Sequence, residues 1–185
     1  MHMIKRDSKK GQEVIGMSIN TILSIFIIAV IIAVAIYTIV HFLNINKCTN
    51  VGFFYESLQS EVNKARASRR YNDVFEKEIV SSGALKTSVE FVCFGNLTAI
   101  AGGDDITRRQ SFNYGNSYNR NANVFMYPGE KTCQGLASKK IEHVKIVGPN
   151  GIERFFCLDV KALNGKIRVK LEKEVRDNLV RLSET

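Results

Sequence analysis

Four cysteines are the residues of this chain whose types and spacing define the clearest chemistry. They stand at Cys48, Cys93, Cys133 and Cys157, all on the C-terminal side of a long apolar run. An even set of cysteines beyond such a run is typical of disulfides formed in an oxidising compartment. The sequence has no Cys-x-x-Cys pair, so we expect disulfides rather than a zinc site. Three pairings are open, and four buried free thiols are the alternative interpretation.

The motifs of common catalytic and cofactor sites do not occur in the sequence. The three histidines are far apart, and there is no Gly-x-Ser-x-Gly, no phosphate loop and no His-Glu-x-x-His. We therefore expect no catalytic residue, no cofactor and no metal ion. An enzyme is the least favoured class of function.

Two stretches of the C-terminal part could carry binding or modification. Residues 101–123 combine arginine, tyrosine and asparagine, whose side chains can stack on bases or sugars. The candidate partner-binding residues in this stretch are Arg108, Arg109, Tyr114, Tyr118 and Arg120. We favour an exposed, variable loop without a binding role, so nucleic acid is a disfavoured partner. Separately, Asn96-Leu97-Thr98 is a sequon that makes Asn96 a candidate glycosylation site.

The element that positions all of these residues is the apolar run over residues 14–46. It contains no Lys, Arg, Asp or Glu, and about 20 apolar residues in a helix are enough to cross a bilayer. We predict one transmembrane helix over residues 14–46, with a leader over residues 1–13. A buried helix of a soluble protein is the alternative, although such helices rarely need so long an uncharged run.

Charge on the two flanks of this run predicts its orientation. Four basic residues lie within nine positions before it, whereas Lys47 and Lys64 are the only ones in a comparable stretch after it. Because basic flanks stay in the cytoplasm, we expect a cytoplasmic N-terminus and an extracytoplasmic C-terminal part. The chain carries a net charge of +8, and its scattered basic residues indicate a solvated surface more than an acidic partner.

The leader ends in a short motif that resembles a known family. Lys9-Lys10-Gly11 followed by Gln12 and an apolar helix resembles the precursor of an archaeal type IV pilin or archaellin. The resemblance implies that a prepilin peptidase cuts after Gly11, so that Gln12 becomes the mature N-terminus. Many pilins have Glu at the fifth mature position, where this chain has Gly16. Phrases further along, such as Val92-Cys93-Phe94, are similar to uncharacterised membrane-anchored proteins of small-genome archaea.

Helical periodicity resumes after the apolar run and predicts an amphipathic helix over residues 47–70. Its apolar face, spaced by three and four residues, comprises Val51, Phe54, Tyr55, Leu58, Val62 and Ala65. This helix either continues the transmembrane helix or starts anew after Thr49-Asn50.

Residues 71–185 form a predicted β-rich domain, which makes the fold class α+β. Strand patterns cover residues 74–80, 88–94 and 123–128. We predict an antiparallel three-stranded meander over residues 140–147, 152–160 and 166–171, with turns at Asn150-Gly151 and Asn164-Gly165. Its last strand places Ile167, Val169 and Leu171 on one buried face. A short C-terminal helix follows over residues 172–183, with Val175, Leu179 and Leu182 on one side.

This organisation favours a structural role in the cell envelope. The expected partners are the membrane, other copies of the chain or other membrane subunits through the apolar helix, and a prepilin peptidase. The favoured function is a pilin-like, surface-anchored subunit, present in the membrane or in an extracellular filament. The alternatives are an unprocessed single-span subunit of a larger membrane complex, and a minor pilin-like adhesin or DNA-binding protein.

Overall fold

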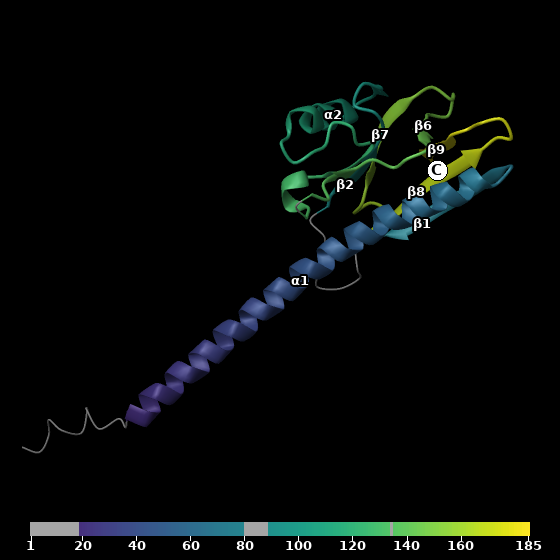
Figure 1. The fold of residues 1–185 in the computed structure, drawn as a ribbon. Helices are drawn as coiled ribbons and strands as arrows, with labels where there is room; N and C mark the ends of the chain where they lie inside the picture. Colours follow the sequence, from purple (N-terminus) through teal and green to yellow (C-terminus); the bar gives the residue numbers. More distant parts are fainter. Residues whose placement is uncertain (1–18, 80–88, 134) are drawn as a thin grey trace, which may run out of the picture. The chain divides into compact units, whose positions relative to one another are not determined.

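A long helix, a shorter helix and two β-sheets make up the described part of the chain (Figure 1). The computed structural model describes residues 19–79, 89–133 and 135–185, and it divides the chain into two compact units, Met1–Asn44 and Ile45–Thr185. We call the second unit the head. The elements in chain order are α1 (Ile19–Ala67), β1 (Tyr71–Glu78), β2 (Phe91–Phe94), β3 (Ile100–Ala101), α2 (Asp105–Tyr114), β4 (Val124–Tyr127), the 3-10 helix η1 (Gly129–Lys131), β5 (Ser138–Lys139), β6 (Val144–Ile146), β7 (Arg154–Asp159), β8 (Lys166–Lys173) and β9 (Val180–Glu184).

Helix α1 runs through both the apolar and the amphipathic sequence patterns without a break at Thr49-Asn50. Its C-terminal end is closed by side chains, because the last carbonyl groups of a helix have no donor within the helix. Lys173 of β8 donates from Nζ to the carbonyl oxygens of Arg66 and Ser68, at 2.8 and 2.6 Å. The Ser68 hydroxyl donates to the Lys64 carbonyl at 3.0 Å. These bonds fix the point at which the helix ends and β1 begins.

The first sheet has the strand order β1-β8-β9-β6. Strands β1 and β8 pair antiparallel from Tyr71 opposite Lys173 to Glu78 opposite Lys166, whereas β6 and β9 pair in parallel. In β8 the predicted alternation is confirmed, since Ile167, Val169 and Leu171 are fully buried. The sheet therefore has one face toward a core and one toward solvent.

The second sheet has the strand order β3-β7-β2-β4-β5. Strand β2 lies between β4 and β7 and pairs antiparallel with both, while the two-residue strand β3 pairs in parallel with β7. Both sheets are thus mixed, which corrects the expectation of purely antiparallel pairing. The predicted strand over residues 123–128 is confirmed as β4, which ends at Tyr127 because the next residue, Pro128, lacks the N–H that a sheet needs.

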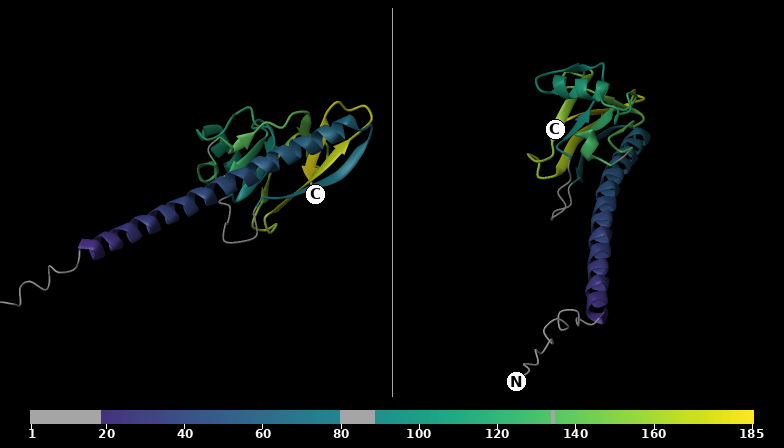
Figure 2. Two further views of the ribbon diagram at one scale, coloured as in Figure 1. Left: turned by 60° about the horizontal axis from the view of Figure 1, so that its bottom comes forward. Right: turned by 90° about the vertical axis from the view of Figure 1, so that its left-hand side faces the viewer.

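Alternation along the strands of the second sheet divides the head into two cores. Val92 and Phe94 of β2 join the larger core, together with the buried faces of α1 and the first sheet. Cys93 between them points to the opposite side, into a smaller core with Phe112 of α2. Figures 1 and 2 show the C-terminal half of α1 beside β1 and β8, with α2 on the far side of β2 and β7. Helix α1 therefore covers the face of the second sheet that joins the larger core, and α2 covers the opposite face.

The predicted three-stranded meander is wrong. Strand β6 pairs with β9, β7 pairs with β2 and β8 pairs with β1, so the three segments divide between two sheets. The tight turn at Asn150-Gly151 is present, but it joins β6 and β7 only through an isolated bridge between Val147 and Glu153. Each segment is alternately apolar, and such a pattern identifies a strand but not the strand that pairs with it.

The predicted C-terminal helix over residues 172–183 is also wrong, because this stretch completes β8, turns and forms β9. Val180 and Leu182 are buried two residues apart, which is the period of a strand. Val175 and Leu179, which the helical pattern placed on the buried side, are 62% and 43% exposed. Residues 101–123, expected to be an exposed loop, likewise contain the regular helix α2.

Candidate functional site

The apolar part of α1, Thr21–Phe42, is the feature that most constrains function. These 22 residues have a mean hydropathy of 3.0 and would extend about 33 Å at ~1.5 Å per residue, against ~30 Å for the hydrocarbon core of a bilayer. Large apolar side chains are exposed all around the segment, among them Phe26 at 66% and Ile31 at 61%. Among the described residues, this is the one helix long and apolar enough to cross a membrane. We call it the apolar segment.

Polar side chains near the end of the apolar segment have partners within the same helix. The Thr38 hydroxyl donates to the carbonyl oxygens of Val34 and Ala35 at 2.8 and 2.9 Å, a bond that Thr commonly makes inside helices. One turn apart, the rings of Tyr37 and His41 stack with their centroids 6.0 Å apart. Aromatic rings with polar atoms are enriched where a membrane helix meets the headgroup region.

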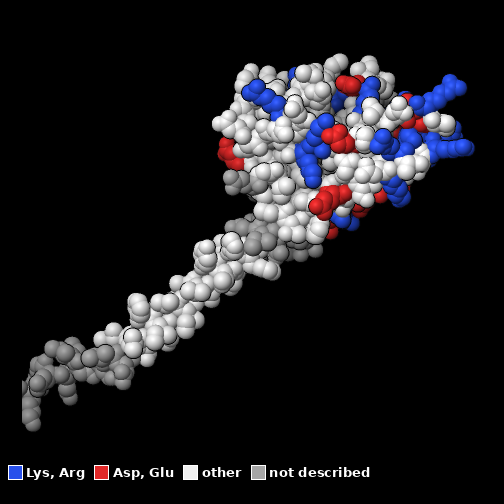
Figure 3. Space-filling view, viewed as in Figure 1, with Lys and Arg blue, Asp and Glu red and all other residues white. Residues whose placement is uncertain are grey.

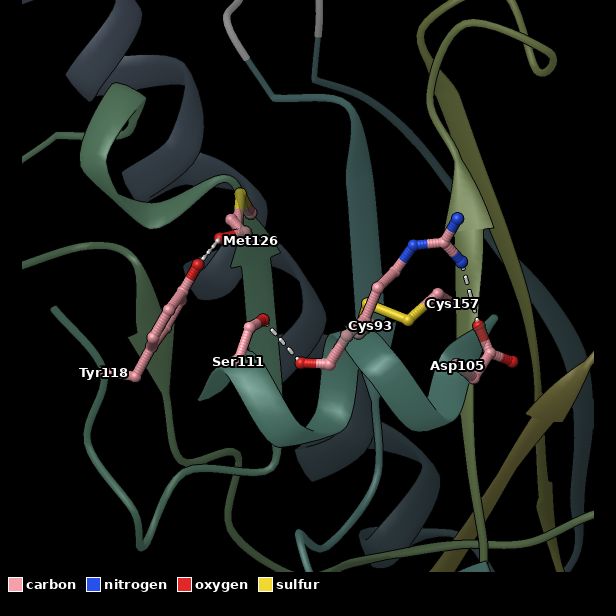
Figure 4. Close-up of a disulfide and its surroundings, with 7 residues drawn as sticks. Cys93, Asp105, Ser111, Tyr118, Met126 and Cys157 are labelled. Carbon is pink, nitrogen blue, oxygen red and sulfur yellow. Dashed lines mark hydrogen bonds and ion pairs between the residues drawn. A yellow bond between two sulfur atoms is a disulfide. The ribbon is translucent and has the colours of Figure 1, made fainter. Parts of the chain in front are cut away.

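All four cysteines form disulfides in the structure, in one of the three pairings that the sequence left open. Cys48 of α1 bonds to Cys133 in the loop after η1, and Cys93 of β2 bonds to Cys157 of β7. The second pair occupies directly opposed positions of neighbouring strands (Figure 4). The first disulfide ties helix α1 to the loop after β4, and the second joins two central strands.

Helix α2 carries three of the five residues predicted to bind a partner, Arg108, Arg109 and Tyr114. Arg108 forms an ion pair with Asp105 at 3.1 Å, and its guanidinium lies 3.7 Å from the centroid of the Phe91 ring. Burial raises the pKa of the Asp105 carboxyl, and the neighbouring Arg108 opposes that rise. The Arg109 guanidinium donates to the Ala99 carbonyl. Both arginines therefore hold α2 against the second sheet.

Tyr118 also serves the packing of the head. Its ring contacts Phe112 at a centroid distance of 4.6 Å. Its hydroxyl accepts from the Gly129 N–H at 2.6 Å. The same hydroxyl donates to the Met126 carbonyl at 3.3 Å (Figure 4). Burial raises the pKa of Tyr118 to about 12. Of the five candidates, Tyr114 and Arg120 are exposed and Arg108, Arg109 and Tyr118 have structural contacts.

Asn96 lies on an exposed turn between β2 and β3 and borders a hollow of about 630 Å³. The hollow draws its polar lining from separate parts of the chain, including Arg120, Lys145 and Glu153. Sequence reasoning did not predict this hollow, because no motif links residues that come together only through strand pairing. Gly11 and Gln12, the predicted processing residues, lie outside the described residues.

Charge on the head is mixed rather than gathered into one field. Figure 3 shows Lys and Arg interspersed with Asp and Glu over the visible face of the head. Several basic residues have acidic partners, as when Glu76 accepts from Arg168 at 2.7 Å and pairs with Lys166 at 3.5 Å. Within residues 19–79, 89–133 and 135–185, no group of three or more His, Cys, Asp or Glu side chains could hold a metal ion.

Comparison with known proteins does not assign the chain to a group: no protein-family model, no curated protein and no solved structure matches it.

Proposed function

We propose that this chain is a single-span structural subunit of an archaeal cell envelope, built on the plan of a type IV pilin. In this proposal the apolar segment lies in the membrane, the N-terminus is cytoplasmic and the head is displayed outside. The apolar helix packs against other copies or other membrane subunits. Such a subunit would work by helix packing and surface display.

The observation that carries the proposal is the exposure of the apolar segment on all sides. A helix of a soluble protein buries its apolar face against the rest of the fold, and a helix that is apolar all around is stable only in a core or a bilayer. The described head has its own buried face of α1, which begins at Val51. The apolar segment is exposed throughout, and a bilayer would give its side chains apolar surroundings.

Two further features support a head outside the cytoplasm. Both disulfides are of a kind that persists in oxidising compartments. Lys5, Arg6, Lys9 and Lys10 precede the apolar run, and basic residues beside a span favour the cytoplasmic side.

The pilin plan is supported by the difference between the apolar half and the amphipathic half of α1. A pilin's first helix has an apolar half for the membrane or the filament core, followed by an amphipathic half packed under a β-rich domain. Here Val51, Phe54 and Leu58 pack in the larger core beneath the first sheet. Processing between Gly11 and Gln12 by a prepilin peptidase completes the proposal.

The proposal is tested by the mass and N-terminal sequence of the protein purified from its native membrane. We expect a chain that begins at Gln12. A Gly11→Leu variant should keep its leader, because cleavage requires the small residue, whereas a control Gly16→Ala variant should be processed normally. A native protein that retains residues 1–11 would contradict the pilin plan and favour an unprocessed subunit of a larger membrane complex. A DNA-binding or adhesive head has less support, since Arg108 and Arg109 contact the head itself.

A further inference from the structure

Asn96 stands out in the sequence and in the structure together. It is the only Asn of the chain that is followed two positions later by Ser or Thr. Asn96 and Thr98 are both exposed, whereas Leu97 between them is 7% exposed and packs in the smaller core. The turn thus anchors its middle residue and presents to solvent the two side chains that an N-glycosylation enzyme must reach.

The local backbone gives this turn a defined shape. Gly95 has a φ of 140°, and a Cβ atom there would lie 2.7 Å from the Phe155 Cα, so only glycine fits the approach to β7. The Ala99 N–H donates to the Asn96 carbonyl at 2.9 Å. The Thr98 N–H donates to Oδ1 of Asn96 at 3.2 Å, which makes an Asx turn.

This Asx turn bears on the reactivity of the Asn96 amide. The hydrogen bond engages Oδ1 and draws negative charge onto it, so that the Nδ2 protons become more acidic. Nδ2 is the atom to which a sugar is attached, and this bond does not occupy it. The turn therefore holds the amide by its oxygen and leaves its nitrogen for reaction.

The hollow beside Asn96 has groups that can bind the first sugars of a glycan. It is open to solvent and is lined by Arg120, Asn121, Lys140, Lys145 and Glu153, among others. Charged and amide side chains supply donors and acceptors for sugar hydroxyl groups. Strand β6 forms one wall of the hollow and is an edge of the first sheet.

We propose that Asn96 carries an N-linked glycan whose first sugars lie in this hollow and cover strand β6. The donor is a sugar chain carried on a polyprenyl phosphate or diphosphate. Nδ2 of Asn96 forms a bond to the anomeric carbon, and the bond from that carbon to the phosphate oxygen breaks. The polyprenyl phosphate or diphosphate leaves with the electron pair, and the Nδ2 proton passes to a base of the transferase. The inference rests on the proposed function, because the reaction takes place outside the cytoplasm.

The glycan would protect an exposed part of the sheet. An edge strand presents unpaired N–H and C=O groups that can pair with another chain. Sugars over β6 would also cover Leu179, an exposed apolar residue that lines the same hollow. Glycosylation at Asn96 thus directs contacts between subunits away from this edge.

The site is tested by peptide mass spectrometry on the full-length protein from its native cells. We expect the peptide containing Asn96 to carry a sugar chain in the wild type and in a Thr98→Ser variant. The modification should be lost in Asn96→Gln and in Thr98→Val, which keeps the shape of threonine without its hydroxyl. A bare Asn96 in the wild-type protein would overturn the inference.

A second sequon separates failure of this site from failure of the proposed topology. Lys166→Thr creates a sequon at Asn164, on a turn remote in sequence from Asn96. A sugar on Asn164 beside a bare Asn96 would refute the site and leave the external head intact. If neither Asn96 nor Asn164 carried a sugar, the glycosylation site would be refuted. Digestion of intact cells with an external protease would then show whether the head lies outside.

The placement of the first sugars in the hollow is tested by hydrogen exchange, measured on the glycosylated wild type and on Thr98→Val. We expect slower exchange over residues 144–146 when the glycan is present. Strand β1, the opposite edge of the same sheet, is the internal control and should not change. Equal exchange at β6 in the two proteins would contradict the placement of the sugars over this strand.

Discussion

The two halves of helix α1 differ in the exposure of their apolar side chains. In the apolar segment, large side chains such as Ile28 and Ile31 are 56% and 61% exposed. In the amphipathic half, Phe54 and Leu58 are fully buried while their neighbour Phe53 is 55% exposed. One continuous helix thus has a half that packs in the larger core of the head and a half whose apolar side chains are exposed.

The difference teaches that exposure and apolarity must be considered together. Phe53 is a single exposed apolar residue, which is normal on a protein surface. The apolar segment spans 22 residues with a mean hydropathy of 3.0 and is not buried, which is an exposed apolar surface far beyond what soluble proteins show. Four changes test this contrast, taken from the largest expected effect to the smallest.

Placing two charges in the apolar segment should have the largest effect. A Lys near the centre of a membrane helix costs about 2.5–3.5 kcal/mol, and the Ile that it replaces contributes about 0.3–0.6 kcal/mol. Ile28→Lys with Ile31→Lys should therefore cost roughly 6–8 kcal/mol of insertion free energy. We expect the double variant to leave the membrane fraction upon alkaline carbonate washing. The control, Ser60→Lys with Asn63→Lys on the exposed side of the amphipathic half, should stay. Equal retention of the two variants would contradict the membrane assignment.

Truncation in the amphipathic half should destabilise the head without affecting membrane retention. Phe54→Ala removes a fully buried ring that contacts Phe75 at a centroid distance of 5.9 Å, and such a change costs about 3–5 kcal/mol. Phe53→Ala, one residue away and exposed, should stay within about 0.5 kcal/mol of the wild type. Denaturant unfolding of the full chain in detergent, followed by circular dichroism, measures both. Similar losses for the two variants would show that the buried face is misplaced.

Removing the Cys48–Cys133 disulfide should have a smaller effect. The bond joins residues 85 positions apart, and a native disulfide of this kind contributes about 2–4 kcal/mol by restricting the unfolded chain. We expect the Cys48→Ser, Cys133→Ser double variant to unfold at a lower denaturant concentration by that margin. In Cys48→Ser alone, a maleimide should label Cys133. An unlabelled Cys133 in that variant would mean that the pairing is different.

The smallest effect is expected at the C-terminal end of α1. Lys173→Met removes the bonds from Nζ to the carbonyl oxygens of Arg66 and Ser68 and should cost about 1 kcal/mol. Lys170→Met, three residues earlier on the same strand, breaks an exposed pair with Glu172 and should cost less than about 0.5 kcal/mol. The same unfolding measurement compares them, and a larger loss for Lys170→Met would reverse the interpretation.

Local periodicity predicted the parts of the fold that depend on one segment at a time. The apolar face from Val51 to Ala65 is buried at all six predicted positions, because a helix face repeats every three to four residues whatever lies opposite. The buried side of β8 was likewise evident from its period of two. Both predictions needed no knowledge of a partner.

Features that depend on distant partners were not predictable in this way. Strand β7 precedes β8 in the chain but pairs with β2, where Cys157 meets Cys93. In α2 only Phe112 is buried, too few positions for a helical pattern, and its place depends on Phe125, with a centroid distance of 4.9 Å. The hollow beside Asn96 depends on the same long-range pairings, so the sequon was evident from the sequence and its surroundings were not.

External proteolysis of intact cells tests most directly whether the apolar segment anchors an outward-facing head. The full-length chain, carrying an epitope after Thr185, is treated with trypsin before and after the cells are opened. If the head is outside, trypsin should remove the epitope from intact cells and leave a membrane-bound fragment that contains the apolar segment. An epitope that stays protected until the cells are opened would contradict the proposed orientation of the head.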